Sequence, residues 1–365
     1  MKKILFVSSW NIFNERTWSG TPYGIYSALS KKTAVEILHT SRKKSNLFVT
    51  IFEKIQNQIT MGRFSLKHGT KILNHTSQCK DLPCIVFSEF NSNFASNFYC
   101  YQDLSVDFVL RDTNYAQMRS SKFVSKSQAN RKRKEALIFY KNCAGIFTMS
   151  NWLREDLIKN TGIDANKVHH VGGGCNVDIS KINYKQKEGN KFIFVGRDWA
   201  RKNGELVVEA FKSLALRLPQ YNAQLYIAGP SSCPQSIQGN NNIHFLGNLS
   251  ADELYKYYNL CDYFVMPSNF EAYGLVFGEA LSFGLPCIGK NCYAMPEFIK
   301  DGKNGYLIQN SDAQELTVKM ERLLVDGASM AKEVQNNRES YISLYSWDSV
   351  ASKITEIIKK DGYDL

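Results

Sequence analysis

Short apolar runs alternate with amphipathic segments along the whole chain. This alternation is typical of parallel β-sheets that carry helices on both faces. The predicted strands are residues 4–8, 35–39, 84–88, 145–149, 191–195, 224–228, 243–246, 263–267 and 287–289. The fold class is therefore predicted to be α/β, with doubly wound sheets.

Amphipathic segments between these runs predict the helices. Their ranges are 22–31, 152–159, 205–214, 251–261, 274–283 and 346–360. Ser346 is a suitable N-cap for the last of them because its hydroxyl can accept from a free N–H group of the first turn. Ligands of doubly wound sheets bind beyond the carboxyl ends of the strands, so the loops after strands are the places to search for a site.

The chain of 365 residues is long enough for two domains. A segment with three glycines, residues 167–178, interrupts the alternation, and the strand pattern restarts at 191. We expect one Rossmann-like domain over 1–178, a second over 179–345, and a separate C-terminal helix over 346–365.

Bulk composition narrows the class of protein. No apolar run approaches the roughly 20 residues of a membrane span, and the apolar run at the start is too short for a signal peptide. The nine cysteines include no C-x2-C pair, which argues against a thiolate zinc site and favours reduced thiols. These features predict a cytoplasmic protein.

Charge is unevenly distributed. Residues 1–185 hold 27 Lys and Arg against 13 Asp and Glu, whereas residues 186–365 hold 18 against 21. A basic first half indicates an anionic partner. The segment 121–134 is either a solvated or acceptor-binding face or a lipid-binding one. The segment 42–59, basic and then amphipathic, either lies on an anionic membrane or packs on its own domain.

Two glutamates follow the strand at 263–267. Glu271 is expected in the loop and Glu279 inside the next helix. Carboxylates accept paired hydrogen bonds from vicinal hydroxyls, which sugars and ribose both offer. Gly274 and Gly278 were expected to let a ligand approach the start of that helix, whose N–H groups suit an anion.

Two further loops carry candidate chemistry. The loop after 191–195 contains Arg197, Arg201 and Lys202 just before a helix, which suits a diphosphate; a solvated basic loop is the alternative. The loop after the first strand contains Gly20, which permits close approach of the backbone to the donor phosphates. The alternative is that this loop is a plain connection.

The order of these motifs resembles the retaining GT-B glycosyltransferases called group 1, or family 4. The resemblance rests on Gly196-Arg197 with Lys202, on Ala228-Gly229-Pro230, on Glu271 and Glu279 eight apart, and on Pro296-Glu297 before Asp301-Gly302. It implies two Rossmann-like domains facing across a cleft, with the final helix returning to the first.

The resemblance also implies roles. Gly20, Gly196, Arg197 and Lys202 would lie at the donor diphosphate, with backbone groups of Tyr273, Gly274, Leu275 and Val276; Glu271 would contact the transferred sugar and Glu279 the ribose. No metal or other cofactor is expected, since Arg and Lys neutralise the diphosphate. Asp103 would take the acceptor-side role that many relatives give to a histidine, with Asp112 as its rival. Arg111 is the alternative candidate, for binding an acceptor phosphate. Ala294-Met295 replaces the usual glycine pair.

The predicted function is retaining transfer of a hexosyl group from a UDP- or GDP-sugar by front-face displacement. A glycan, lipid-linked or part of a surface polysaccharide, is the expected acceptor, at the inner face of a membrane. The alternatives are a GT-B phosphorylase or epimerase, and a basic protein that binds nucleic acid or another anionic surface. If the protein is a glycosyltransferase, no nucleic-acid partner is expected.

Overall fold

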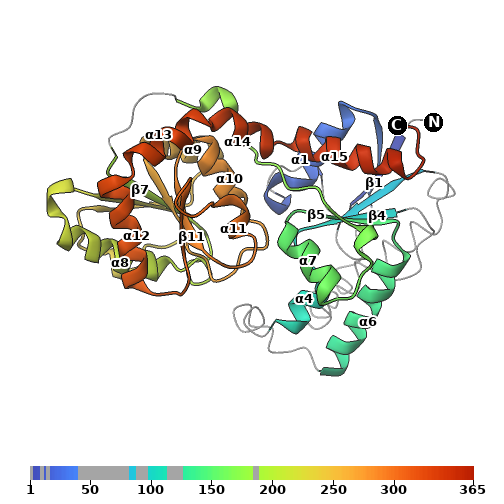
Figure 1. The fold of residues 1–365 in the computed structure, drawn as a ribbon, viewed down its shortest axis with the longest axis horizontal. Coiled ribbons are helices and arrows are strands. Elements are labelled where there is room, and N and C mark those ends of the chain that lie inside the picture. Colours follow the sequence, from blue (N-terminus) through green and yellow to red (C-terminus); the bar gives the residue numbers. More distant parts are fainter. Residues whose placement is uncertain are drawn as a thin grey trace, which may run out of the picture. The chain divides into compact units, whose positions relative to one another are not determined.

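The computed structural model describes residues 3–8, 12–13, 17–39, 82–87, 98–112, 126–183 and 189–365. The chain forms two compact units. Unit 1 comprises Met1–Gly174 and Ser346–Leu365, and unit 2 comprises Cys175–Tyr345. Each unit is built on its own six-stranded parallel sheet (Figure 1), as the predicted α/β class requires.

The sheet of unit 1 has the strand order β2-β1-β3-β4-β5-β6. Its strands are β1 Lys3–Ser8, β2 Ala34–His39, β3 Cys84–Phe87, β4 Phe98–Gln102, β5 Gly145–Thr148 and β6 Val168–His170. Its principal helices are α1 Thr21–Ser30, α4 Val106–Arg111, α6 Lys126–Asn142, α7 Asn151–Lys159 and α15 Trp347–Lys360. The apolar pattern does not predict β4, β6, α4 or α6, because β4, β6 and α4 are short and the large apolar residues of α6 are confined to its second half.

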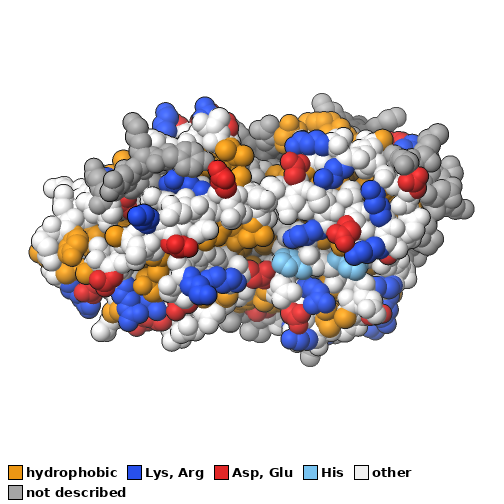
Figure 2. Space-filling view, turned by 45° about the horizontal axis from the view of Figure 1, so that its top comes forward, with side chains coloured by type: hydrophobic (Ala, Val, Ile, Leu, Met, Phe, Trp, Pro, Cys, Tyr) orange, Lys and Arg blue, Asp and Glu red, His pale blue; other side chains and the backbone are white. Residues whose placement is uncertain are grey.

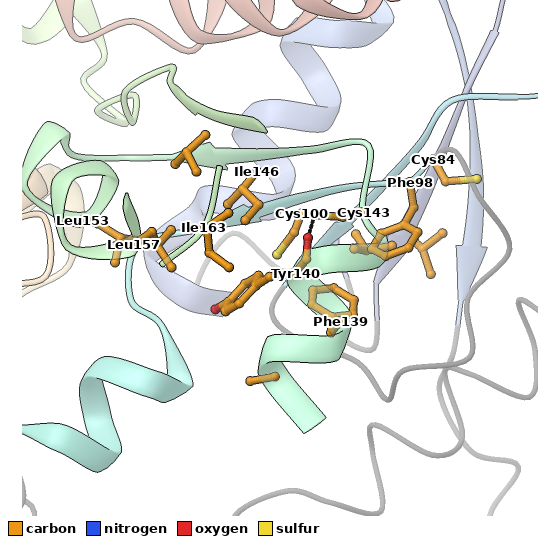
Figure 3. Close-up of a cluster of buried hydrophobic side chains, with 14 of the residues drawn as sticks. Cys84, Phe98, Cys100, Phe139, Tyr140, Cys143, Ile146, Leu153, Leu157 and Ile163 are labelled. Atoms are coloured by element: carbon orange, nitrogen blue, oxygen red, sulfur yellow. Dashed lines mark hydrogen bonds between the residues drawn. The ribbon is translucent and has the colours of Figure 1, made fainter. Parts of the chain in front are cut away.

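The core of unit 1 lies where α6 and α7 cover the sheet (Figure 3). Phe139 and Tyr140 of α6 are fully buried, and the ring of Phe139 lies 5.0 Å from that of Phe98 in β4. The Tyr140 hydroxyl donates to the buried side chain of Gln102 at 3.1 Å. A helix whose first half is basic is therefore anchored by its apolar second half.

The C-terminal helix α15 belongs to unit 1, where it packs on α1. Ser346 caps it by accepting from the N–H of Ser349 at 3.1 Å, as expected. A Cβ at Gly24 would lie 2.3 Å from the indole of Trp347, and one at Gly174 would lie 2.4 Å from the same ring. The two glycines therefore make room for the tryptophan.

The sheet of unit 2 has the order β12-β11-β10-β7-β8-β9. Its strands are β7 Lys191–Val195, β8 Gln224–Ala228, β9 Ile243–Gly247, β10 Tyr263–Val265, β11 Cys287–Lys290 and β12 Gly305–Ile308. Its helices are α8 Gly204–Arg217, α9 Ala251–Leu260, α10 Leu275–Ser282, α11 Met295–Phe298, α12 Ala313–Asp326, α13 Ala328–Asn336 and α14 Arg338–Leu344. The apolar pattern does not predict β12 or α11–α14.

Among the described residues, no helix combines the length and apolar character that a membrane span requires. No group of three or more His, Cys, Asp or Glu side chains in this part of the chain is arranged to hold a metal ion.

Candidate functional site

The strand order of unit 2 reverses between β7 and β10. From β7 the chain proceeds to β8 and β9 on one side, while β10, β11 and β12 extend on the other. Since β7 and β10 are adjacent and parallel, the loops that follow them leave the same edge of the sheet. Such a switch point is where doubly wound sheets bind ligands, and these two loops carry the lysine and the first glutamate of the sequence motifs.

The loop after β7 brings Lys202 onto Glu271 in the loop after β10. The ammonium Nζ of Lys202 donates to Oε1 of Glu271 at 2.8 Å and also lies 3.0 Å from Sδ of Met266. The side chains of Lys202 and Glu271 are only 11% and 9% exposed. This is a nearly buried ion pair between two residues that lie far apart in the sequence.

Arg201 joins the same carboxylate. Its Nη1 donates to Oε1 of Glu271 at 2.9 Å and to the backbone oxygen of Phe270 at 2.6 Å. Its Nε donates to Asp198 at 3.2 Å. From the sequence, Arg201 is one of three cations in this loop that suit a diphosphate; its bond to Glu271 is not predicted.

Oε1 of Glu271 accepts a third side-chain bond, from the hydroxyl of Ser268 at 3.1 Å. Burial alone raises the pKa of this carboxyl, but the charges of Lys202 and Arg201 outweigh burial, so the pKa of Glu271 is held below its ordinary value. Glu271 is therefore an ionised carboxylate at neutral pH.

Two glycines let the loops approach this closely. A Cβ at Gly196 would lie 2.2 Å from Cδ of Lys202, so the missing side chain provides the space for the lysine stem. A Cβ at Gly229, after β8, would lie 2.5 Å from the backbone of Gly196. Gly229 also has φ 119°, a conformation that favours glycine.

A reciprocal amide pair fastens the two loops together. Nδ2 of Asn203 donates to Asn269 at 2.9 Å, and Nδ2 of Asn269 donates back at 2.6 Å. The backbone N–H of Asn269 also donates to the carbonyl of Arg201 at 2.8 Å. Asn203 occupies the left-handed region, with φ 57°, directly before α8. The positions of Arg201 and Lys202 are thus fixed relative to Glu271.

Helix α10 begins beside this cluster. Gly274 precedes it with φ 98°, and the first N–H groups of a helix have no partner within the helix. Leu275 and Val276 form its first turn. Tyr273 is 6% exposed because its ring packs 4.9 Å from that of Phe298. The N-terminus of α10 therefore follows directly after the loop that carries Glu271, and contact of the backbone at 273–276 with a phosphate stays a prediction.

Glu279 lies on α10 and is partly buried. The hydroxyl of Tyr258 donates to its Oε2 at 3.4 Å. Burial raises the pKa of Glu279 to about 7, against the opposing effects of Tyr258 and of the Lys202 charge. Lys202 therefore acts electrostatically on both glutamates.

One expectation about unit 2 is wrong. Gly278 was expected to leave space for a ligand, but a Cβ there would lie 2.5 Å from Sγ of Cys175, so protein fills the space. Arg197 is exposed at the start of the loop, and its expected place at the donor diphosphate stays a prediction, while Arg201 bonds to Glu271. The substituted pair Ala294 and Met295 is fully buried.

In unit 1, the loop after β1 meets the loop after β4. The indole N–H of Trp18 donates to Asp103 at 3.3 Å, and its ring packs at 6.2 Å from Tyr101. Gly20 follows with φ 79°, in the left-handed region. The structure therefore groups Gly20 and Asp103 at one edge of this sheet, whereas Asp112 ends α4.

Arg111 is held within unit 1 by carboxylates. Its Nη2 donates to both oxygens of Asp156, at 2.9 and 2.8 Å, and its Nε donates to the buried Asp107 at 3.3 Å. Arg133 of α6 also donates to Asp107. These bonds give Arg111 a structural role, in place of the acceptor phosphate weighed for it.

Part of the basic segment 121–134 belongs to the network of bonds around Asp107. Arg133 pairs with Asp107, and Lys132 is 9% exposed; the segment 42–59 lies outside the described residues. On the face that Figure 2 shows, Lys and Arg side chains are interspersed with Asp and Glu. Charge in the described part of unit 1 is thus partly compensated internally.

Comparisons with known proteins place similar sequences among the glycosyltransferases. Residues 177–340 match the family model for glycosyl transferases group 1. The uncharacterized glycosyltransferase MJ1607 of Methanocaldococcus jannaschii is 26% identical over 245 residues, which is 62% of each chain. A GDP-mannose-dependent alpha-(1-6)-phosphatidylinositol monomannoside mannosyltransferase of Mycobacterium tuberculosis is 24% identical over 192 residues, 49% of each chain.

The fold extends the likeness to the whole chain. Sucrose-phosphate synthase from Thermosynechococcus elongatus matches with a TM-score of 0.69 and 15% identity, over 99% of each chain. This likeness confirms the predicted two-domain GT-B fold. In sequence, the chain spans less than two thirds of the two relatives named above, and these matches support the predicted class of enzyme.

Proposed function

We propose that the protein is a glycosyltransferase that takes a hexosyl group from a nucleoside-diphosphate sugar bound by unit 2. The observation that carries the proposal is the cluster of Lys202, Arg201 and Glu271 at the switch point of the sheet. It combines cations for a diphosphate with an ionised carboxylate for sugar hydroxyls. The match of 177–340 to the glycosyltransferase family supports it independently.

Each part of the donor has a proposed place. The diphosphate lies at Lys202, Arg197 and the N-terminus of α10, where the free N–H groups and the helix dipole favour negative charge. Glu271 binds hydroxyls of the transferred sugar and Glu279 binds the ribose. No side-chain nucleophile is required if the leaving phosphate helps to deprotonate the acceptor, so transfer proceeds on one face with retention. Metal is not required in this scheme because cations and N–H groups stabilise the leaving diphosphate.

The acceptor is proposed to be a glycan, lipid-linked or destined for a surface polysaccharide, bound by unit 1 near Asp103. The basic composition of residues 1–185 supports an anionic acceptor or membrane surface. The printed name of the mycobacterial relative, a phosphatidylinositol mannoside enzyme, is consistent with a lipid-linked acceptor. A cytoplasmic location at the inner face of a membrane follows from this proposal.

Binding measurements separate this function from the alternative of a nucleic-acid-binding protein. We expect UDP or GDP, and one of their sugars, to bind the wild-type protein, with loss of binding in Lys202→Ala. A single-stranded RNA and a duplex DNA serve as probes for the nucleic-acid alternative. Binding of RNA or DNA without binding of any nucleoside diphosphate would refute the proposal.

A further inference from the structure

In the free protein, Lys202 and Arg201 share one counter-ion. Both donate to the same atom, Oε1 of Glu271, at 2.8 and 2.9 Å. In the proposed function, Lys202 also neutralises the donor diphosphate. A lysine is a single point charge on a flexible stem, so an arriving diphosphate draws Lys202 away from Glu271.

Arg201 is held much more firmly than Lys202. Its guanidinium bonds to Asp198, to the carbonyl of Phe270 and to Glu271. Its own carbonyl accepts from Asn269 at 2.8 Å. Both the side chain and the backbone of Arg201 are therefore bonded to the loop after β10. The planar guanidinium group keeps a fixed geometry.

We propose that Arg201 is the positioning residue of the donor site, which keeps Glu271 ionised and in place when the donor diphosphate engages Lys202. The inference rests on the proposed function, because it concerns the complex with donor. Arg201 acts through Glu271 and need not touch the diphosphate. Ser268, which also donates to Oε1, orients the carboxylate but supplies no charge.

Removal of Arg201 should affect nucleotide binding and donor turnover to different extents. Without Arg201, the free protein still has Lys202 against Glu271, so a nucleoside diphosphate should bind with nearly wild-type affinity. In the complex with donor, however, Glu271 loses its remaining cation and its anchor. Because small misplacements of a reacting group reduce rate steeply, turnover should fall much more than affinity.

The experiment compares the wild-type protein with Arg201→Ala, Arg201→Lys and the control Arg217→Ala. Arg217 lies at the other end of α8, with a half-exposed side chain that pairs at 3.7 Å with Glu321. For each variant, kcat and KM for donor hydrolysis, the pH profile of kcat and the affinity for UDP and GDP are measured. Circular dichroism verifies that each is folded.

For Arg201→Ala we expect kcat to fall about 100-fold, nucleoside diphosphate affinity to change less than about threefold, and the acidic limb of the kcat profile to move to higher pH. Arg201→Lys, which keeps the charge but not the fork, should be intermediate, and added guanidinium should partly restore Arg201→Ala. Arg217→Ala should match the wild type.

Two results would overturn the proposal. An unchanged kcat in Arg201→Ala would remove Arg201 from the site, and an affinity loss equal to the loss in kcat/KM would make it a direct phosphate ligand. If the wild type hydrolyses no nucleotide sugar and binds no nucleoside diphosphate, the proposed function fails first, and the role of Arg201 falls with it.

Discussion

The ammonium of Lys202 lies 2.8 Å from Oε1 of Glu271, although 69 residues separate the two in the sequence. Parallel strands β7 and β10 lie side by side and deliver both residues to one edge of the sheet. An ion pair with so little exposure costs desolvation energy to form, and removal of either partner destabilises the protein because the other charge stays uncompensated. The pair therefore links the fold of unit 2 to its proposed chemistry.

Replacing Glu271 by Gln should reduce donor turnover by about 100-fold. The amide keeps the shape of the side chain but cannot balance Lys202 and Arg201. We expect some loss of stability as well, about 1–3 kcal/mol, because Lys202 loses the carboxylate it pairs with and Arg201 keeps only Asp198. Steady-state rates and chemical denaturation measure the two effects. A variant that is destabilised but fully active would show that Glu271 is only structural.

Replacing Gly196 by Ala should weaken nucleoside diphosphate binding. The new Cβ would lie 2.2 Å from Cδ of Lys202, so the lysine stem must move away from Glu271. Lys202→Ala alone should weaken binding by about 1.5–3 kcal/mol, the range for a charge-assisted hydrogen bond.

A double-mutant cycle tests that explanation. In the Lys202→Ala background the overlap disappears, so adding Gly196→Ala should cost little further affinity. Calorimetric titration with UDP and GDP measures all four proteins. Equal losses from Gly196→Ala in both backgrounds would contradict the contact as the cause.

Glu279 should make both stability and nucleotide binding depend on pH. Its folded pKa of about 7 lies above the value of 4.5 expected when unfolded. As pH rises from about 4.5 to 7, the unfolded chain loses this proton first, so the contribution of Glu279 to stability decreases over that window. Ribose hydroxyls prefer the ionised carboxylate, so nucleotide affinity should increase with pH through 7.

Glu279→Gln separates these effects. The amide cannot ionise, so the variant should gain stability relative to wild type as pH rises from 5 to 8, while its nucleotide affinity is lower and loses this pH dependence. Thermal melts and titrations across that range measure both. If wild type and variant showed parallel stability profiles, the raised pKa would be wrong.

Trp347 should stabilise unit 1 because its ring fills the space that Gly24 and Gly174 leave open. Trp347→Ala leaves a gap between α15 and α1, and we expect a loss of about 2–3 kcal/mol, below the 3–5 typical of a fully buried aromatic residue because Trp347 is partly exposed. Leu344→Ala, at a side chain that is 55% exposed, is the control. Equal effects of the two changes in denaturation would contradict this role.

The regular apolar patterns predict most strands of both sheets, since short apolar runs such as those in Lys191–Val195 and Gln224–Ala228 are strong strand signals. The strand Phe98–Gln102, with the sequence FYCYQ, is not predicted because so short an apolar run cannot be assigned to a strand or a helix by periodicity alone. Among site residues, Glu271 and Lys202 were predicted through motif spacing. The role of Arg201 and the contacts of Gly278 depend on which loops and side chains meet in space, which spacing along the chain does not specify.

The central claim, transfer from a nucleotide sugar bound at Lys202 and Glu271, is tested most directly by donor turnover. A panel of UDP- and GDP-sugars is incubated with wild type and with Glu271→Gln, and release of the nucleoside diphosphate is measured. We predict that the wild type hydrolyses at least one donor and that the variant does so about 100-fold more slowly. Hydrolysis of none of them by the wild type, or equal rates in the two proteins, would contradict the account.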